Sequence, residues 1–388
     1  MGFMNILLTK QSITGGQLYQ DRAYVIEGGI IRQVESGVCP AQKLTSYEVI
    51  DLRHLTVLPG LIDIHIHGGN GFDTMDGSYE SINAISQYKL AEGVTSFCPT
   101  TVTASLPKTY AAIDSVRTAI EKGTDGAKVL GIFLEGPYIN PKYKGAHPEE
   151  FIRSIDVGEM IDLTERAKPG LVSIAIAPEL PEAIKAIKTL TAKGVHCRIG
   201  HSAATMLETT TGQAAGANVV IHAYNAMSPL HHREPGMVGA MLTLQDLYAE
   251  IICDFQHVNI GAVRILQQCK APERIILITD CLAPGGLKDG EYRLGELPIY
   301  MKDGICRIAE GNLAGSTATL ISCVKNMYQH LGVSLVDAVT MATTAPAKAL
   351  GLYPSIGSLE EGAVADIVAI DEDFNIQFVM INGKVLAF

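Results

Sequence analysis

Positive charge is scarce in this chain, which has 30 lysines and arginines against 41 aspartates and glutamates and a formal net charge of −11 at pH 7. General binders of nucleic acid or of membrane surfaces need a basic face, so the charge balance argues against both kinds of partner. An anionic substrate would have to be held by a local cationic group.

Cysteine pairs with metal-binding spacing are also missing. The eight cysteines are scattered without a Cys-x-x-Cys motif, which excludes a zinc ribbon and suits reduced thiols better than a disulfide framework. No apolar run is long enough to span a bilayer, and the chain does not start with a basic segment followed by an apolar one. We therefore expect a soluble, cytoplasmic protein.

The hydrophobic share of 47% is sufficient for a large core, and short β-rich runs alternate with stretches of helical spacing. The β-rich runs lie at 57–67, 94–100, 128–134, 171–177, 195–200, 219–222, 249–254 and 275–280. Helical stretches lie at 78–92, 106–122, 181–194 and 206–216. The repeated order of strand and helix predicts an α/β fold, a (β/α)8 TIM-type barrel over residues 56–355.

Both ends of the chain differ from this pattern. Residues 5–9, 23–27 and 30–34 have strand character around a Gly28-Gly29 turn, and 365–370 and 377–385 are β-rich with an Asn-Gly turn. We expect residues 1–55 and 356–388 to form one small β-sandwich domain beside the barrel.

The sequence His65-Ile-His67 is the most informative motif. Alternate residues of a strand point to the same side, so both imidazoles can share one metal ion. The run at 61–66 is largely apolar on both faces, as in a buried parallel strand, and Gly68-Gly69 ends it. Because active sites of such barrels lie where the strands end, the pair is a candidate ligand set. The alternative is two histidines held by hydrogen bonds in a loop.

Four further strand ends carry residues of ligand type: Glu135, His201, His222 and Asp280. Imidazole nitrogens and carboxylate oxygens suit Zn²⁺, Fe²⁺ or Mn²⁺, and a carboxylate can bridge two ions. Taken singly, Glu135 could form a loop salt bridge, His201 could neighbour a helix cap and Asp280 could be a solvated turn residue. Together on one face of the barrel, they predict a metal centre.

These residues and their neighbours resemble the N-acetylglucosamine-6-phosphate deacetylase family of the amidohydrolase superfamily over nearly the whole chain. The most specific segments are Leu134-Glu-Gly-Pro-Tyr, Lys144-Gly-Ala-His147, His222-Ala-Tyr-Asn-Ala-Met-Ser, His232-Arg-Glu-Pro-Gly236 and Asn312-Leu-Ala-Gly-Ser316. The resemblance implies metal-dependent removal of the acetyl group from N-acetylglucosamine 6-phosphate, which yields glucosamine 6-phosphate and acetate.

The same resemblance implies a ligand set for each of two ions. Glu135, His201 and His222 would hold one divalent metal, and His65 and His67, with Glu135 as a bridge, would hold a second. Some members of the family lack the His-x-His pair and use one ion; this chain retains it, so two ions are expected. Zinc is the expected metal, with iron or manganese as alternatives.

The resemblance also implies roles in catalysis and binding. Asp280 would take a proton from the attacking water and pass it to the departing amine, which fits the needs of amide hydrolysis. Either His147 or His257 would polarise the acetyl carbonyl, with His147 the expected group. The implied contacts to the sugar phosphate are Ala146, His147, Asn225, the Ala226 amide, Arg233, His257, Leu313, Ala314 and Gly315.

Arg233 is the implied phosphate ligand, donated across the interface of a homodimer. A guanidinium offers a planar fork that matches phosphate oxygens. No phosphate-binding glycine loop is present, because Gly68-Gly-Asn-Gly71 lacks both the Lys-Ser/Thr that ends such a loop and its spacing. The alternative is a surface arginine paired with Glu234.

Two other functions remain open on these motifs. One is a deacetylase of N-acetylgalactosamine 6-phosphate or another amidohydrolase, which would use the same metals. The other is a catalytically silent scaffold protein on the same fold, which is disfavoured because all six ligand and acid positions are intact.

Overall fold

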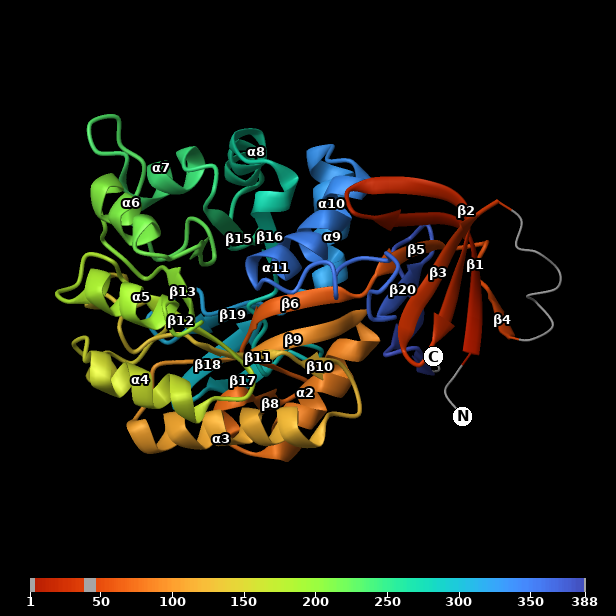
Figure 1. Ribbon diagram of the computed structural model, residues 1–388. Coiled ribbons are helices and arrows are strands. Elements are labelled where there is room, and N and C mark those ends of the chain that lie inside the picture. The colour runs from red at the N-terminus through yellow and green to blue at the C-terminus, as the bar shows by residue number, and fades with distance from the viewer. Residues whose placement is uncertain (1–3, 38–46, 387–388) are drawn as a thin grey trace.

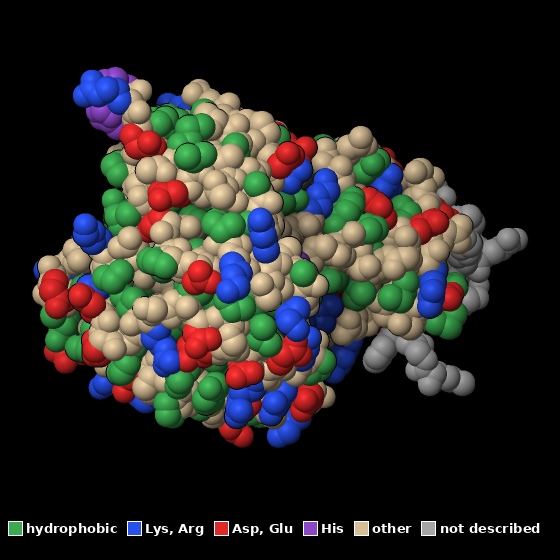
Figure 2. Space-filling model, turned by 60° about the vertical axis from the view of Figure 1, so that its left-hand side comes forward, with side chains coloured by type: hydrophobic (Ala, Val, Ile, Leu, Met, Phe, Trp, Pro, Cys, Tyr) green, Lys and Arg blue, Asp and Glu red, His purple; other side chains and the backbone are tan. Residues whose placement is uncertain are grey.

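The computed structural model describes residues 4–37 and 47–386, and Figure 1 shows a barrel with helices beside a smaller β unit. Cys39 lies outside the described residues, and the seven cysteines within them are free thiols. On the face in Figure 2, acidic and basic side chains are interspersed. In the described part of the chain, every helix is too short or too polar to serve as a membrane span.

The barrel strands follow one another in chain order around a parallel sheet. They are β6 (Leu61–Ile66), β9 (Val94–Thr101), β10 (Lys128–Val129) with β11 (Gly131–Leu134), β12 (Leu171–Ile176), β13 (His196–Ile199), β14 (Val219–Val220), β15 (Tyr248–Ile252) and β16 (Ile275–Ile278). The last strand returns to the first, where the Asp280 N–H donates to the His65 carbonyl at 2.9 Å. Each β-rich run of the sequence contains a barrel strand, so the predicted barrel is confirmed.

The barrel is covered by helices whose apolar faces pack against the strands (Figure 1). They are α2 (Tyr79–Ala91), α3 (Leu106–Lys122), α4 (Val157–Arg166), α5 (Ala183–Thr191), α6 (Met206–Ala214), α7 (Gly236–Thr243), α8 (Ile260–Cys269), α9 (Leu320–Leu331), α10 (Leu335–Ala342) and α11 (Thr344–Ala349). The four predicted helices are all present. Local signals set their starts: α6 begins at a capping box of Thr205 and Glu208.

The predicted first strand, 57–67, is wrong in one respect, because the structure divides it. β5 (Thr56–Pro59) pairs with the sheet of the chain ends, and only β6 enters the barrel. Gly60 lies between them, where a Cβ atom would come within 2.1 Å of Thr95 Oγ1. The close approach of Gly60 to Thr95 therefore requires glycine. No sign of the division is visible in the sequence, because the apolar run continues from one sheet into the other without a change in composition.

The ends of the chain form one eight-stranded sheet in the order β22-β21-β20-β5-β1-β2-β3, with β4 paired to β1. Besides β5, its strands are β1 (Met4–Thr14), β2 (Gln17–Glu27), β3 (Ile30–Ser36), β4 (Glu48–Asp51), β20 (Ile367–Ile370), β21 (Ile376–Ile381) and β22 (Lys384–Leu386). The sheet folds over a core that includes Leu7, Tyr24 and Met380. The expected small β unit built from both ends is confirmed, and the Asn382-Gly383 turn has the left-handed backbone that such hairpins need.

A small sheet that the sequence patterns did not reveal follows β16. It consists of β17 (Gly290–Leu294), β18 (Leu297–Lys302) and β19 (Ile305–Ile308). Its apolar side chains pack with Val102 and Leu282, which follow barrel strands. This insertion therefore contributes to the wall of the cavity described next.

Candidate active site

The candidate ligands meet at the carboxyl ends of the barrel strands, where parallel strands bring their last residues together. The set comprises His65, His67, Glu135, His201, His222 and Asp280. All six side chains are buried. The structure thus brings together residues that are far apart in sequence. His65 and Asp280, 215 positions apart, lie within the distance of an ion pair.

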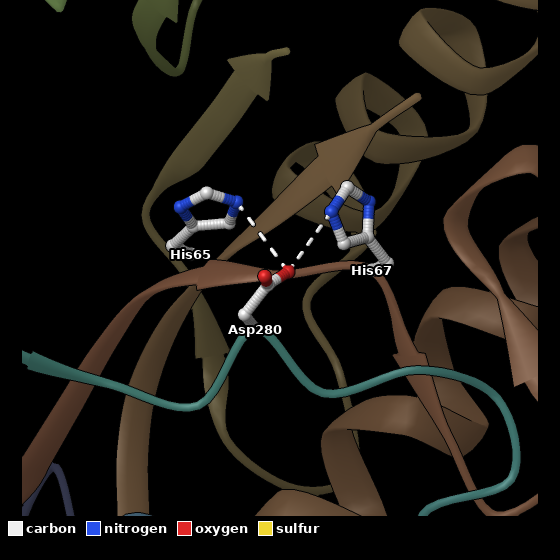
Figure 3. Close-up of side chains that lie close together, drawn as sticks. All are labelled: His65, His67 and Asp280. Atoms are coloured by element: carbon white, nitrogen blue, oxygen red, sulfur yellow. Dashed lines mark ion pairs between the residues drawn. The ribbon is translucent and has the colours of Figure 1, made fainter. Parts of the chain in front are cut away.

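His65 and His67 both face Asp280 (Figure 3), as the alternation along β6 predicts. The two Nε2 atoms lie 3.6 and 3.2 Å from Asp280 Oδ1. They also face Glu135, at 3.4 Å from Oε1 and 3.0 Å from Oε2 respectively. His65, His67 and Asp280 form one group with metal-binding geometry.

His201 and His222 also approach Glu135. Their Nε2 atoms lie 3.2 and 3.0 Å from Glu135 Oε1 and 3.0 Å from each other. Glu135, His147 and His201 form a second group with metal-binding geometry. Glu135 therefore stands between two clusters of imidazoles, which is the position expected of a bridging carboxylate.

The hydrogen bonds of two imidazoles fit a metal ion. His65 Nδ1 lies 2.9 Å from Glu250 Oε2, and His201 Nδ1 lies 2.7 Å from the Tyr143 carbonyl oxygen. Both partners only accept hydrogen bonds, so each Nδ1 carries the proton and each Nε2 presents a lone pair to the cluster. His65 Nε2 is buried without a hydrogen-bond partner, as a ligand awaiting a cation would be.

The electrostatics also favour a cation. Burial alone would lower the pKa of His67, yet the Asp280 and Glu135 carboxylates raise it to about 9. Burial opposes ionisation of Glu135, but the surrounding histidines hold its pKa well below the usual range. The carboxylates thus demand positive charge at this point, which protons or a divalent ion can supply.

Three of these residues adopt a backbone conformation that side chains other than glycine rarely take. The φ angles of His201, His222 and Asp280 are +46°, +29° and +49°. Such strain persists where the surrounding structure over-determines it, as it often does in functional sites. At Asp280 the backbone is held on both sides, because its N–H donates to the His65 carbonyl at 2.9 Å and its own carbonyl accepts from the Ser316 N–H at 2.7 Å.

His147 presents an N–H group to the same cluster. Its Nδ1 accepts a hydrogen bond from the Thr103 N–H at 3.2 Å and lies 2.8 Å from Thr103 Oγ1. The proton therefore sits on Nε2, 3.6 Å from Glu135 Oε2. Burial, with a contribution from the neighbouring His201, lowers the pKa of His147 to about 4, so the ring is a neutral donor at pH 7.

His257 is held by a carboxylate, to which its Nδ1 donates. Its Nδ1 lies 2.7 Å from Asp254 Oδ2, and its Nε2 is buried without a hydrogen-bond partner. Burial would lower the pKa of His257, but Asp254 raises it. The Nδ1–H group donates to Asp254, so Nε2 carries an N–H in the imidazolium form, which Asp254 stabilises and which is suited to an anionic or carbonyl oxygen.

The cluster opens into a cavity of about 230 Å³. Of the residues expected to bind substrate, those that line it are Ala146, His147, Asn225, Ala226, His257, Leu313, Ala314 and Gly315. The sequence patterns missed its apolar wall of Val102, Ile252, Leu282 and Leu294. The alternation of apolar and polar residues around 292–301 was an available sequence signal for Leu294.

Arg233 is not brought to this cavity. It is exposed, and its Nη1 lies 3.0 Å from Nε2 of the adjacent His232. The alternative pairing with Glu234 is not formed either, because that carboxylate accepts hydrogen bonds from the N–H groups of Met206 and Gly236 at 2.9 and 3.1 Å. Figure 2 shows histidine and basic side chains together on a projection of the surface.

Residues 56–386 match the amidohydrolase family. The chain belongs to that family. It is 40% identical over 378 residues to the N-acetylglucosamine-6-phosphate deacetylase of Vibrio furnissii, a match that covers 97% of this chain and 94% of the relative. It is also 40% identical over 356 residues to the N-acetylgalactosamine-6-phosphate deacetylase of Escherichia coli O157:H7, covering 92% and 94%.

Solved structures agree with this assignment. An N-acetyl-D-glucosamine-6-phosphate deacetylase mutant from Mycobacterium smegmatis, in complex with N-acetyl-D-glucosamine-6-phosphate, superposes with a TM-score of 0.93 at 32% identity over the full length of both chains. The N-acetylglucosamine-6-phosphate deacetylase of Pasteurella multocida gives 0.92 at 30%, also over both full chains. The resemblance seen in the sequence motifs is thereby confirmed.

Proposed function

We propose that this protein hydrolyses the acetamide bond of N-acetylglucosamine 6-phosphate, releasing acetate and glucosamine 6-phosphate. The observation that carries the proposal is the cavity in which Glu135, His201, His222 and Asp280 meet the expected sugar-binding residues. Support comes from relatives of this name and from the complex of the M. smegmatis mutant.

The proposed metal set is the one implied by the family resemblance, supported by the approach of all four histidines to Glu135. Glu135, His201 and His222 would hold one ion, and His65 and His67, with Glu135 as the bridge, a second. Such an ion would act as a Lewis acid toward the carbonyl and would lower the pKa of water. Zinc is the proposed metal, because nitrogen and carboxylate ligands suit it, with iron and manganese as alternative results of metal analysis.

The chain's own residues would move the protons. Asp280 would accept one from the attacking water and deliver it to the amine nitrogen as the C–N bond breaks. The His147 Nε2–H would donate to the acetyl carbonyl oxygen, and its low pKa keeps it a neutral donor throughout. The His257 Nε2 and the Ala226 amide would hold oxygens of the sugar phosphate.

The lining residues of the cavity include neither lysine nor arginine to pair with the phosphate. We propose that Arg233 of a second copy supplies the cation in a homodimer. An apolar groove formed by Tyr224, Met227, Pro229, Leu230, Val238, Leu242 and Ile265 supports this arrangement. Leu230 lines this groove, is 59% exposed and lies three residues before Arg233 in sequence. Burying the groove against a second copy would therefore place the 230–234 loop of each copy at the interface.

A cytoplasmic location is also proposed, on the basis of the seven free thiols of the described residues.

The preference for one sugar epimer is part of the test of function. Acetate release should be measured for N-acetylglucosamine 6-phosphate and N-acetylgalactosamine 6-phosphate with the metal content determined on the same sample. The proposal expects a higher kcat/KM for the gluco compound. A preference for the galacto epimer, or absence of turnover with full metal content, would contradict it.

A further inference from the structure

A buried ion pair inside the barrel lies directly beneath the metal ligands. Arg198 on β13 and Glu250 on β15 are both fully buried, and Arg198 Nη1 lies 2.6 Å from Glu250 Oε1. The pair touches the active site at one point, because Glu250 Oε2 accepts the hydrogen bond from His65 Nδ1. Neither residue lines the cavity.

The arginine binds the strand as well as the carboxylate. Its Nη1 donates to the carbonyl of Ile64, next to His65, at 3.1 Å, and its Nη2 donates to Ser173 Oγ on β12 at 3.0 Å. The guanidinium lies 4.2 Å from the centre of the Phe133 ring, whose edge-to-face partner is His65 at 4.9 Å. One side chain thus fixes the backbone, the ring wall and the carboxylate around His65.

Stability alone does not account for the pair. Removing two charges from water is costly, and apolar residues of similar volume often give equal or greater stability at such positions. The pair does, however, determine which nitrogen of His65 carries the proton. Arginine only donates hydrogen bonds and a carboxylate only accepts them. Arg198 therefore donates to Glu250, which stays an acceptor, and His65 must donate to it from Nδ1.

We propose that Arg198 and Glu250 are positioning residues that hold His65 in the tautomer required to bind the second metal ion, the one on the side of His65 and His67. This rests on the proposed function. The ion bound by Glu135, His201 and His222 has a separate support, because His201 is oriented by the Tyr143 carbonyl. The two ions should therefore respond differently to a change at Glu250.

The decisive variant is Glu250→Gln. The glutamine oxygen would face the Arg198 donors, which leaves its NH₂ group against His65 Nδ1 and forces the proton onto Nε2, away from the tautomer that binds metal. A matched control is Glu92→Gln, which also removes a carboxylate from a buried pair, with Lys89 Nζ at 2.8 Å. Glu92 has no hydrogen bond or ion pair to the six ligand-cluster residues among the described contacts.

The measurement is calorimetric titration of the metal-free proteins with Zn²⁺, which gives the number and affinity of bound ions. Wild type and Glu92→Gln should bind two ions per subunit. In Glu250→Gln the affinity for one ion should fall about 10- to 100-fold, the usual effect of losing a partner that orients a metal-binding histidine, while the other is unchanged. Two ions bound by Glu250→Gln with wild-type affinity would overturn the inference.

A double variant, Arg198→Met with Glu250→Leu, covers the case in which Glu250→Gln fails to fold. It removes the whole ion pair and still leaves His65 Nδ1 without its acceptor, so one ion should again be weakened, and wild-type binding of both would overturn the inference. A wild type that deacetylates with a single bound ion overturns the inference but not the proposed function. A wild type that binds two ions yet releases no acetate contradicts the proposed function alone.

Discussion

The ligand cluster and the loop at 230–234 differ in how their positions are fixed. The cluster residues are buried, come from the carboxyl ends of five barrel strands and are tied by contacts from residues far away in sequence, such as Glu250 to His65. The loop is exposed, and Arg233 contacts its own neighbours His231 and His232. On the proposed function, a single subunit would supply the groups that act on the amide bond, whereas its phosphate contact would depend on a second copy.

The most damaging change should be within the cluster. His201→Ala removes a ligand from the first ion and should abolish turnover together with part of the bound metal, because metal sites lose affinity steeply when a ligand is deleted. Metal analysis and acetate release on the same preparation are the measurements. Full metal content in the variant would remove His201 from the ligand set.

Asp280→Asn tests the proton transfer without removing a histidine ligand. The amide cannot accept the proton from water, so kcat should fall by at least ~10²-fold while substrate binding stays near normal. Steady-state kinetics with an equilibrium binding measurement separate the two effects. Normal turnover would exclude Asp280 from the mechanism.

Arg233→Ala tests the loop. The loss of hydrogen bonds to a charged group should lower kcat/KM roughly 10- to 150-fold for the phosphorylated sugar and leave the unphosphorylated sugar almost unaffected. An equal loss for both sugars would show that Arg233 acts on the fold or the chemistry and does not hold the phosphate.

Mixed dimers sharpen the comparison between the two regions. When Arg233→Ala and Asp280→Asn subunits carry different tags and are co-expressed, one site of each mixed dimer has an intact aspartate and an arginine from the other copy. Activity should exceed that of either parent. Mixed dimers no more active than the parents would place Arg233 within its own subunit or outside the site.

The sequence predicted the barrel and the meeting of the ligands because strand ends of a parallel barrel share one face, so residue type and strand order were sufficient. It did not reveal the partners beneath them. Glu250 and Arg198 lie within short, largely apolar strands, and their contact depends on how three strands align in space. The inserted strands that bring Leu294 to the cavity were likewise missed. Leu294 reaches the cavity wall by packing with residues outside the inserted strands, such as Val102 and Leu282.

The smallest expected effect concerns one such contact near the site. Thr103→Val removes the hydroxyl beside His147 Nδ1 but keeps the backbone N–H that donates to the same atom. The tautomer should therefore persist, and kcat should fall only about 2- to 12-fold, the range for a single neutral hydrogen bond. Steady-state kinetics should be measured for Thr103→Val and for His147→Ala, so that the two losses of kcat can be compared. If Thr103→Val were as damaging as His147→Ala, the hydroxyl and not the backbone would set the orientation of the ring, and the cluster would depend on side chains outside the strand ends.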